Sequence, residues 1–351
     1  MEQKPSVNGR HLWMDCLRLL AMVAVIVIHV VALQWDKVQL HTADWFVVCA
    51  YNSSVRWGVL VFLMISGSLF LDPQKQLPLR TLFGKYILRL VIAYFAWSTV
   101  YALFVFDGSL TGFVKNVITG YYHMWYLPVL AGLYAMLPLL RKVTEDAKLH
   151  GYILALALVG GFLIPNAIAV LQEFSSVGHW FGSLWDNAGM QLVFDYSCFF
   201  VAGYILNRME LGKRWRIAIY VAGIASWLLT IVAVWFLGNR TNNHGVLLLR
   251  ASFLNIALQA PAMFVFGKYV LQPMRFSNKL SGWIRGAARC SFGVYLVHPL
   301  VLEVLVKLAG EPLSAMPLWL WIPALTVIVL VLSLAVAWVL TKIPVVRKYL
   351  V

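Results

Sequence analysis

The run MDCLRLLAMVAVIVIHVVALQ, residues 14–34, decides the class of fold. It is almost wholly apolar, and its length matches the roughly 20 helical residues that cross about 30 Å of hydrocarbon. A removable signal peptide has an apolar core of only about 7–15 residues, so we expect this run to be the first permanent membrane helix. Nine further runs of similar character follow, at 45–71, 82–106, 121–140, 151–171, 189–207, 217–237, 248–271, 291–309 and 317–341.

The composition agrees with residence in a bilayer. Of the 351 residues, 62% are hydrophobic and 12% are charged, whereas about a quarter of a soluble domain is charged. The connections are short, and the chain has no low-complexity linker or evident internal repeat. We therefore predict an all-α, polytopic integral membrane protein with about ten transmembrane helices in one domain, residues 1–351.

The basic residues give the predicted helices a direction. With the N-terminus inside, 18 Lys and Arg fall in the inner segments and 3 in the outer loops, namely Lys37, Lys115 and Arg240. This bias predicts that both ends of the chain are cytoplasmic, and it accounts for the net charge of +14 without nucleic acid. The four cysteines lack disulfide or metal-site spacing, so we expect buried small side chains and no metal.

Ionisable groups inside a span are costly and point to function. In the first span Arg18 and His29 are eleven residues apart, so they share a helical face about 16 Å apart along the axis. This spacing favours a cation at the cytoplasmic mouth and a base deep in the membrane. The structural alternatives are an ion pair of Arg18 with Asp15 and an interhelical hydrogen bond of His29.

Three basic residues open the third span. Lys85 and Arg89 are i,i+4 neighbours and follow Arg80. They predict either an anion site at the inner mouth or simple anchoring at the membrane surface.

Two later spans also contain histidines. His123 lies among aromatics, with Trp125 and Tyr126 close behind, which is typical of a sugar platform, a second catalytic histidine or an interfacial belt. Tyr295 and His298 share a face of the ninth span, where Pro299 frees a carbonyl one turn earlier that His298 or water could satisfy. A buried, hydrogen-bonded histidine is the structural alternative for His298.

Further polar groups are expected to meet inside the bundle. Arg56 is too deep to reach the surface, and Asp195 in the sixth span should pair with Arg56 or Arg250. Gly67 follows Ser66 inside the second span, which predicts close approach of another backbone.

In their order along the chain, these motifs resemble the membrane-bound acyltransferase-3 family. The residues that give the resemblance are Arg18-x10-His29, Phe62-Leu-Met-Ile-Ser66-Gly67, the basic opening of the third span, His123-Met-Trp125-Tyr126-Leu127, Phe199-Phe-Val-Ala-Gly203-Tyr and Ser291-Phe-Gly-Val-Tyr295-Leu-Val-His298. They cover most of the chain. One departure is Leu60, where the family often has proline, so a kink there is in doubt.

The resemblance implies transfer of an acetyl group, or a similar one such as succinyl, from cytoplasmic acyl-CoA to a hydroxyl of an extracytoplasmic or lipid-linked glycan. It implies a multi-pass protein of the bacterial inner membrane. The expected roles are binding of the 3′-phospho-ADP part of CoA by Arg18, Arg80, Lys85 and Arg89, catalysis by His29, His123 and His298, and substrate binding by Arg56, Trp125, Tyr126, Asp195 and Tyr295.

His29 is the expected base for the acceptor hydroxyl, with His123 or Tyr126 at the oxyanion or the sugar. Direct transfer and an acyl-histidine relay both stay open. Two other classes also stay open. A secondary transporter of glycan precursors would show inverted repeats and broken helices in matched halves, which we do not find in the sequence. A non-catalytic membrane partner or sensor would have little use for Arg18 and His29 on one face.

Overall fold

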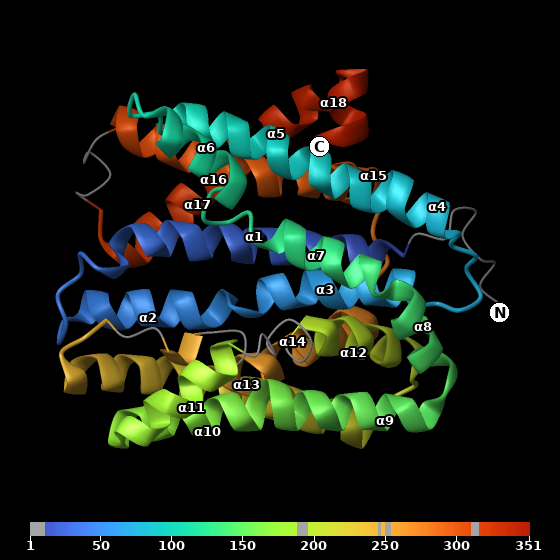
Figure 1. Ribbon diagram of the computed structural model, residues 1–351, viewed down its shortest axis with the longest axis horizontal. Coiled ribbons are helices and arrows are strands. Elements are labelled where there is room, and N and C mark those ends of the chain that lie inside the picture. Colours follow the sequence, from blue (N-terminus) through green and yellow to red (C-terminus); the bar gives the residue numbers. More distant parts are fainter. Residues whose placement is uncertain (1–10, 188–195, 245–246, 250–253, 310–315) are drawn as a thin grey trace.

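The computed structural model describes residues 11–187, 196–244, 247–249, 254–309 and 316–351, and all regular structure in these ranges is helical. The long helices run side by side along the longest axis of the molecule (Figure 1). Eight helical segments of this described part are long and apolar enough to cross a membrane, or nine if the bent pair α7 and α8 is one span. The predicted all-α, polytopic membrane fold is therefore confirmed.

The spans correspond to the predicted runs with shifts of a few residues at their ends. They are α1 (Leu12–Trp35), α2 with α3 (Ala43–Val55, Trp57–Phe70), α4, η1 and α5 (Leu79–Thr81, Leu82–Ile87, Leu88–Phe104), α7 with α8 (Tyr126–Ala135, Leu137–Glu145), α9, η2 and α10 (Ala147–Leu156, Ala157–Leu163, Ile164–Phe174), α13 (Lys213–Thr241), α14 with η5 (Leu254–Phe266, Gly267–Leu271), α16 (Ser291–Ala309) and α17 (Leu318–Leu340).

The remaining helices are shorter. They are α6 (Leu110–Thr119), α11 (Ser176–Asn187), α12 (Ser197–Arg208), η4 (Leu247–Leu249), α15 (Asn278–Arg289) and α18 (Pro344–Tyr349). The sixth predicted run, 189–207, is described only from residue 196 onward, where α12 forms its second part.

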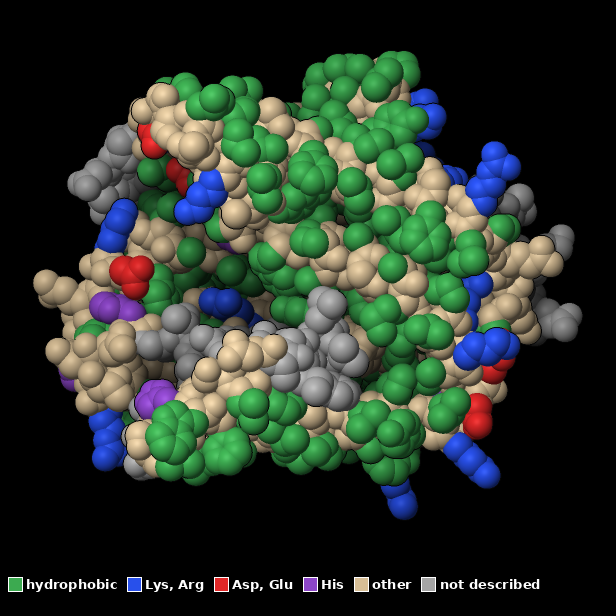
Figure 2. Space-filling view, in the orientation of Figure 1, with side chains coloured by type: hydrophobic (Ala, Val, Ile, Leu, Met, Phe, Trp, Pro, Cys, Tyr) green, Lys and Arg blue, Asp and Glu red, His purple; other side chains and the backbone are tan. Residues whose placement is uncertain are grey.

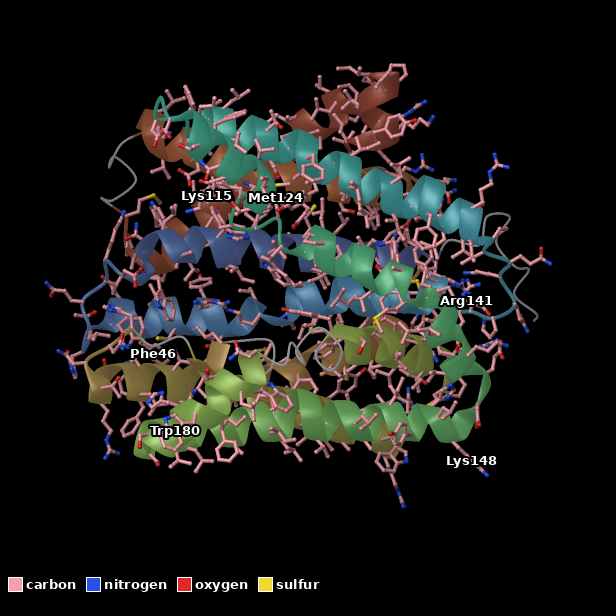
Figure 3. All side chains as sticks on the ribbon, in the orientation of Figure 1. Phe46, Lys115, Met124, Arg141, Lys148 and Trp180 are labelled. Carbon is pink, nitrogen blue, oxygen red and sulfur yellow. The ribbon has the colours of Figure 1, made fainter. Side chains whose placement is uncertain are left out.

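The two ends of the bundle differ in the way that the charge bias predicts. Figure 3 places Phe46, Lys115 and Trp180 at one end and Arg141 and Lys148 at the other. Most Lys and Arg side chains on the face in Figure 2 also lie toward the second end. We call that second end the inner end and the first the outer end.

Close contact between α3 and α12 depends on two glycines. A methyl group added to Gly67 would overlap the backbone carbonyl of Phe200, and one added to Gly203 would overlap the backbone of Met64. Without a hydrophobic driving force between helices in lipid, such backbone contact is a main source of packing energy. The prediction that Gly67 permits close approach is therefore confirmed.

Two spans are broken where the sequence predicted continuous helices. The second span breaks between α2 and α3 at Arg56, although Leu60 replaces the proline that would explain a kink. The fourth bends by 59° at Met136, just before Pro138. It also begins later than predicted, at Tyr126, because residues 121–125 form a turn.

Candidate active site

Three histidines from three different spans meet in the bundle. The ring centroid of His29 in α1 lies 5.0 Å from that of His298 in α16 and 6.4 Å from that of His123. His123 and His298 are 5.7 Å apart. His298 is fully buried and His123 is 2% exposed. Such a group of imidazoles inside a membrane bundle offers proton acceptors and donors away from bulk water.

The fold fixes which nitrogen of His298 bears the proton. Its Nδ1 lies 2.8 Å from the carbonyl oxygen of Tyr295 and 3.0 Å from that of Val294. Both partners can only accept, so Nδ1 must donate, and the neutral ring then has its lone pair on Nε2. The carbonyl of Tyr295 lacks its usual helical donor because Pro299, four residues later, has no N–H. The sequence left either His298 or water as the partner of this carbonyl, and the structure shows His298 in that place.

A tyrosine from α5 satisfies two further backbone groups of α16 next to Pro299. The Tyr101 hydroxyl donates to the carbonyl of Leu296 at 2.8 Å and accepts from the N–H of Leu300 at 3.2 Å. In a regular helix that N–H would bond directly to that carbonyl. Tyr101 is 1% exposed, so its hydroxyl acts as an inserted link in α16, one turn from His298.

A turn brings His123 into the cluster. Gly120 has a φ of 73° and ends α6, and a Cβ at this position would lie 2.7 Å from the hydroxyl of Tyr94. This left-handed residue favours glycine and reverses the chain so that residues 121–125 enter the bundle. The Tyr295 hydroxyl donates to the carbonyl of His123 at 2.5 Å and fixes the turn.

The ring of His123 makes no hydrogen bond through either nitrogen with the described residues, and Nε2 of His298 has no such partner either. Buried polar atoms normally have a partner, and exceptions call for an explanation. A reacting group bound between the rings would provide one.

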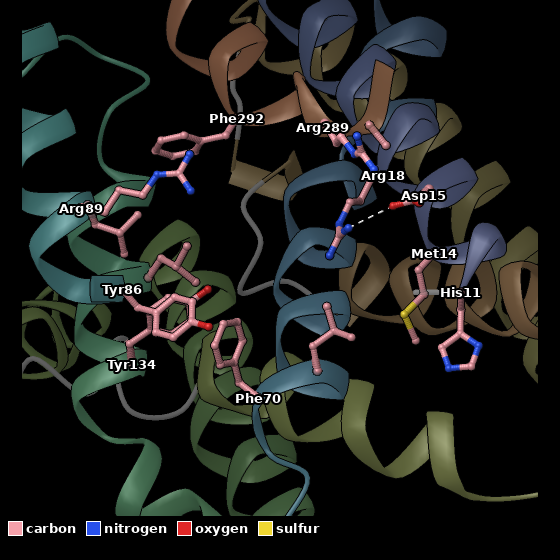
Figure 4. A pocket seen from close by; sticks show the side chains of 14 residues that line it. His11, Met14, Asp15, Arg18, Phe70, Tyr86, Arg89, Tyr134, Arg289 and Phe292 are labelled. Carbon is pink, nitrogen blue, oxygen red and sulfur yellow. Dashed lines mark hydrogen bonds and ion pairs between the residues drawn. The ribbon is translucent and has the colours of Figure 1, made fainter. Parts of the chain in front are cut away.

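A cavity of about 690 Å³ opens at the inner end of the same helices. Among the described residues, Arg18, Arg89 and Arg289 line it together with one acidic side chain, that of Asp15 (Figure 4). Arg18 is 3.1 Å from the Asp15 carboxylate, so the predicted local ion pair forms without removing Arg18 from the wall. The Arg89 guanidinium lies 5.0 Å over the ring of Phe292 and donates to the main-chain oxygen of Val351. Three guanidiniums against one acidic side chain suit a polyanionic ligand.

Aromatic side chains form another part of the wall. Phe70, Tyr86, Tyr134 and Phe292 face the cavity, and the rings of Phe70 and Tyr134 are 4.8 Å apart. They offer stacking surfaces for a flat ring system.

The inner cavity and the histidines are built on the same helices. In α1, Arg18 lines the cavity and His29 belongs to the cluster. In α16 the corresponding residues are Phe292 and His298. Tyr126 lies two turns before the cavity residue Tyr134 in α7, and its ring is 5.7 Å from Tyr295. The same three helices therefore supply residues to both the cavity and the cluster.

The structure separates the basic residues that the sequence grouped. Arg18 and Arg89 line the cavity, whereas Arg80 and Lys85 are exposed and lie outside its wall. Residues 82–87 form the π-helix η1, whose wider turn removes the alignment of residues four apart. Tyr86 faces the cavity in place of Lys85.

The predicted substrate-binding residues also divide. Tyr295 lies beside His123 and Tyr126 lies beside Tyr295, while Trp125 packs against Tyr196 with ring centroids 5.5 Å apart. The side chain of Arg56 donates from Nε to the Asn52 side chain at 2.7 Å. Asp195 and Arg250, the other members of the predicted ion-pair network, lie outside the described residues.

Sequence reasoning missed Arg289 and Tyr134 as lining residues and Tyr101 as a support. Arg289 contributed only to the count of inner charges, although it directly precedes the ninth span as Arg80 precedes the third. Tyr134 and Tyr101 sit in apolar runs without any special spacing, so no local signal marked them.

A family model described as an acyltransferase domain, that of the acyltransferase-3 family, matches residues 11–340. This range includes the cavity arginines and all three clustered histidines. No curated protein and no solved structure matches the chain at a significant level.

Proposed function

Because the chain belongs to the acyltransferase-3 family and is a multi-pass membrane acyltransferase, we propose that it moves an acetyl or similar short acyl group from cytoplasmic acyl-CoA to a hydroxyl of an extracytoplasmic or lipid-linked glycan. The observation that supports this proposal best is the connection of a cationic inner cavity to a buried histidine cluster along shared helices. A bacterial inner membrane is the proposed location.

The inner cavity is the proposed donor site. The 3′-phospho-ADP part of CoA would meet the guanidiniums of Arg18, Arg89 and Arg289, which can each make bidentate, charge-assisted hydrogen bonds to phosphate. The adenine ring has aromatic surfaces available in the same wall. Arg80 and Lys85, exposed outside the wall, would then add only long-range attraction to a polyanion.

The acyl-pantetheine arm would run outward along α1, α7 and α16. Arg18 and His29 are about 16 Å apart along α1, so a narrow, extended chain is needed to bridge the two regions. Tyr126 and Tyr295, which contact each other on this route, would flank the arm where it reaches the histidines.

Transfer requires a base for the acceptor hydroxyl. We assign this role to Nε2 of His298, because the hydrogen bonds of Nδ1 leave the lone pair on that atom. As the acceptor oxygen forms its bond to the thioester carbonyl carbon, Nε2 takes the hydroxyl proton. When the carbon–sulfur bond breaks, the thiolate receives that proton and leaves as CoA.

His29 and His123 border the same space and would donate hydrogen bonds to the carbonyl oxygen as it becomes an oxyanion. This assignment moves the base from His29, which the sequence favoured, to His298. An acyl-histidine relay through Nε2 of His298 would use the same geometry.

Within the family, we propose a likeness to the compact members without a fused extracellular domain, such as the O-acetyltransferase of enterobacterial common antigen. That glycan is therefore the first acceptor to test. Purified protein would receive labelled acetyl-CoA with and without it, and we expect acceptor-dependent release of free CoA. His298→Gln, His29→Ala and Arg18→Ala should each reduce that release strongly.

His150→Gln is the matched control, since His150 lies near the inner end and bonds the carbonyl of Thr144. Uptake of glycan into vesicles without release of CoA would support the transporter instead. Unchanged release in His298→Gln and His29→Ala would refute the assigned chemistry even if transfer itself is observed.

A further inference from the structure

An acidic side chain without a cation lies beside the histidine cluster. Glu303 is in α16, five residues and therefore about 7.5 Å along the axis beyond His298 toward the outer end. One oxygen of its carboxylate accepts a hydrogen bond from the Tyr121 hydroxyl at 2.9 Å. No Lys, Arg or His of the described part of the chain comes within salt-bridge distance of it.

The nearest lysine along the helix is otherwise engaged. Lys307 follows Glu303 by one turn, but its ammonium lies 4.0 Å over the ring of Phe104. A carboxylate within a membrane span is costly and normally has a pairing or functional reason. Since ion pairing does not account for Glu303, its partners are hydrogen-bond donors, of which the Tyr121 hydroxyl supplies one.

Two aromatic rings next to Glu303 form a platform that ends at the histidines. Tyr121 stacks on Tyr101 with centroids 4.5 Å apart and planes 8° apart, so its position is fixed. Tyr122 lies 4.6 Å from Tyr121 and 5.2 Å from the ring of His29. Tyr122 is 52% exposed, and this face of the molecule is recessed over the outer half of α1 (Figure 2).

We propose that Glu303, Tyr121 and Tyr122 form the subsite for the acceptor sugar and that this subsite takes a neutral sugar. The inference rests on the proposed acyl transfer and adds a substrate class to it. The exposed ring of Tyr122 stacks against the apolar face of a pyranose, and the Glu303 carboxylate accepts hydrogen bonds from neighbouring hydroxyls. The adjacent His29 and His298 then meet the hydroxyl that is acylated.

Charge excludes acidic sugars from this subsite. A uronate bound against Glu303 would bring two carboxylates together, and like charges at close range repel. A neutral hexose or N-acetylhexosamine offers only hydroxyl and amide groups and meets no such repulsion. The subsite is thus distinct in charge from the arginine-lined donor cavity.

The test measures steady-state acetyl transfer from acetyl-CoA to chitotetraose, to tetragalacturonate and to enterobacterial common antigen. Glu303→Gln should raise the KM for chitotetraose roughly tenfold, the loss expected when charge-assisted hydrogen bonds become neutral ones. It should leave the KM for acetyl-CoA unchanged. It should also lower the ratio of kcat/KM for chitotetraose to kcat/KM for tetragalacturonate. Glu145→Gln is the matched control, because Glu145 pairs with Lys142 at the inner end.

Tyr121→Phe provides a second variant that keeps the ring and removes the hydroxyl that holds Glu303. We expect its KM for chitotetraose to rise by a smaller factor with the KM for acetyl-CoA again unchanged. An unchanged KM for chitotetraose in both variants, with active wild type, would overturn the subsite while leaving the proposed function intact. Absence of transfer by the wild type to all three glycans would overturn the proposed function itself.

Discussion

Replacing Tyr101 by phenylalanine should impair both the stability of α16 and the acyl transfer. The change keeps the ring that stacks on Tyr121 and removes only the hydroxyl that links Leu296 and Leu300 across the break at Pro299. The N–H and the carbonyl that it bridged are then left without this partner inside the bundle.

The magnitude follows from those two hydrogen bonds. Each buried donor or acceptor that loses its partner costs about 1–3 kcal/mol, so the two groups together should lower the unfolding free energy in detergent by about 2–6 kcal/mol. If the share of one group is needed to hold His298 in its reactive position, kcat should fall about 5- to 150-fold. The KM for acetyl-CoA should change little, because Tyr101 does not line the donor cavity.

Two measurements check this prediction, thermal unfolding in detergent and steady-state acetyl transfer. Tyr51→Phe is the matched control, since its hydroxyl donates to the carbonyl of Trp319 in α17, a helix that supplies none of the three histidines. Adding Pro299→Ala to Tyr101→Phe supplies an N–H for the Tyr295 carbonyl and lets the helix ladder close. We expect this double variant to regain stability but not kcat. The new N–H at position 299 competes with Nδ1 of His298 for the Tyr295 carbonyl, so His298 loses its fixed orientation.

The reasoning would be refuted if Tyr101→Phe unfolded at the same temperature as wild type and kept its kcat. Lower stability with unchanged kcat would show that Tyr101 has only a structural role and does not position His298 for the reaction.

Three further predictions follow from the cavity, the helix contacts and the inner surface. Arg89→Gln should raise the KM for acetyl-CoA by about tenfold or more, whereas Lys85→Gln, outside the cavity wall, should change it little when both are measured at physiological salt. Gly203→Ala should lower the melting temperature in detergent strongly, because the new methyl group overlaps the backbone of α3, while Gly212→Ala, with open space around it, should not. At the inner end, hydrogen bonding to Lys268 lowers the pKa of the Glu210 carboxyl below its ordinary value of 4.5. This carboxylate therefore stabilises the folded state above that pH, and the stabilisation is lost as pH falls through the lowered pKa. Glu210→Gln should reduce the fall in melting temperature that acidification below about pH 4.5 causes.

The sequence predicted the membrane spans well because the bilayer imposes a length on every span. It also predicted the shared face of Arg18 and His29, since α1 is an unbroken helix from Leu12 to Trp35. The bond from His298 to the Tyr295 carbonyl was predictable for a similar reason, because the missing N–H of Pro299 acts within one helical turn.

Arrangements that depend on departures from regular helix were not predictable. The π-helix at residues 82–87 turned Lys85 away from Arg89's side of the span, and no residue in that stretch signals it. The turn at residues 121–125 and the bend at Met136 decide where His123 lies. Contacts between distant spans, such as Tyr101 with α16 or Tyr121 with Glu303, depend on tertiary packing that periodicity cannot specify.

The central claim is that an acyl donor enters from the inner cavity and presents its thioester to the histidine cluster. The most direct test is an experimental structure of the protein with a non-hydrolysable acetyl-CoA analogue. We predict that the phosphates contact Arg18, Arg89 and Arg289 and that the acetyl carbonyl lies within hydrogen-bonding reach of His29, His123 or His298. A nucleotide bound at the outer end, or an acetyl group that ends far from all three histidines, would contradict the claim.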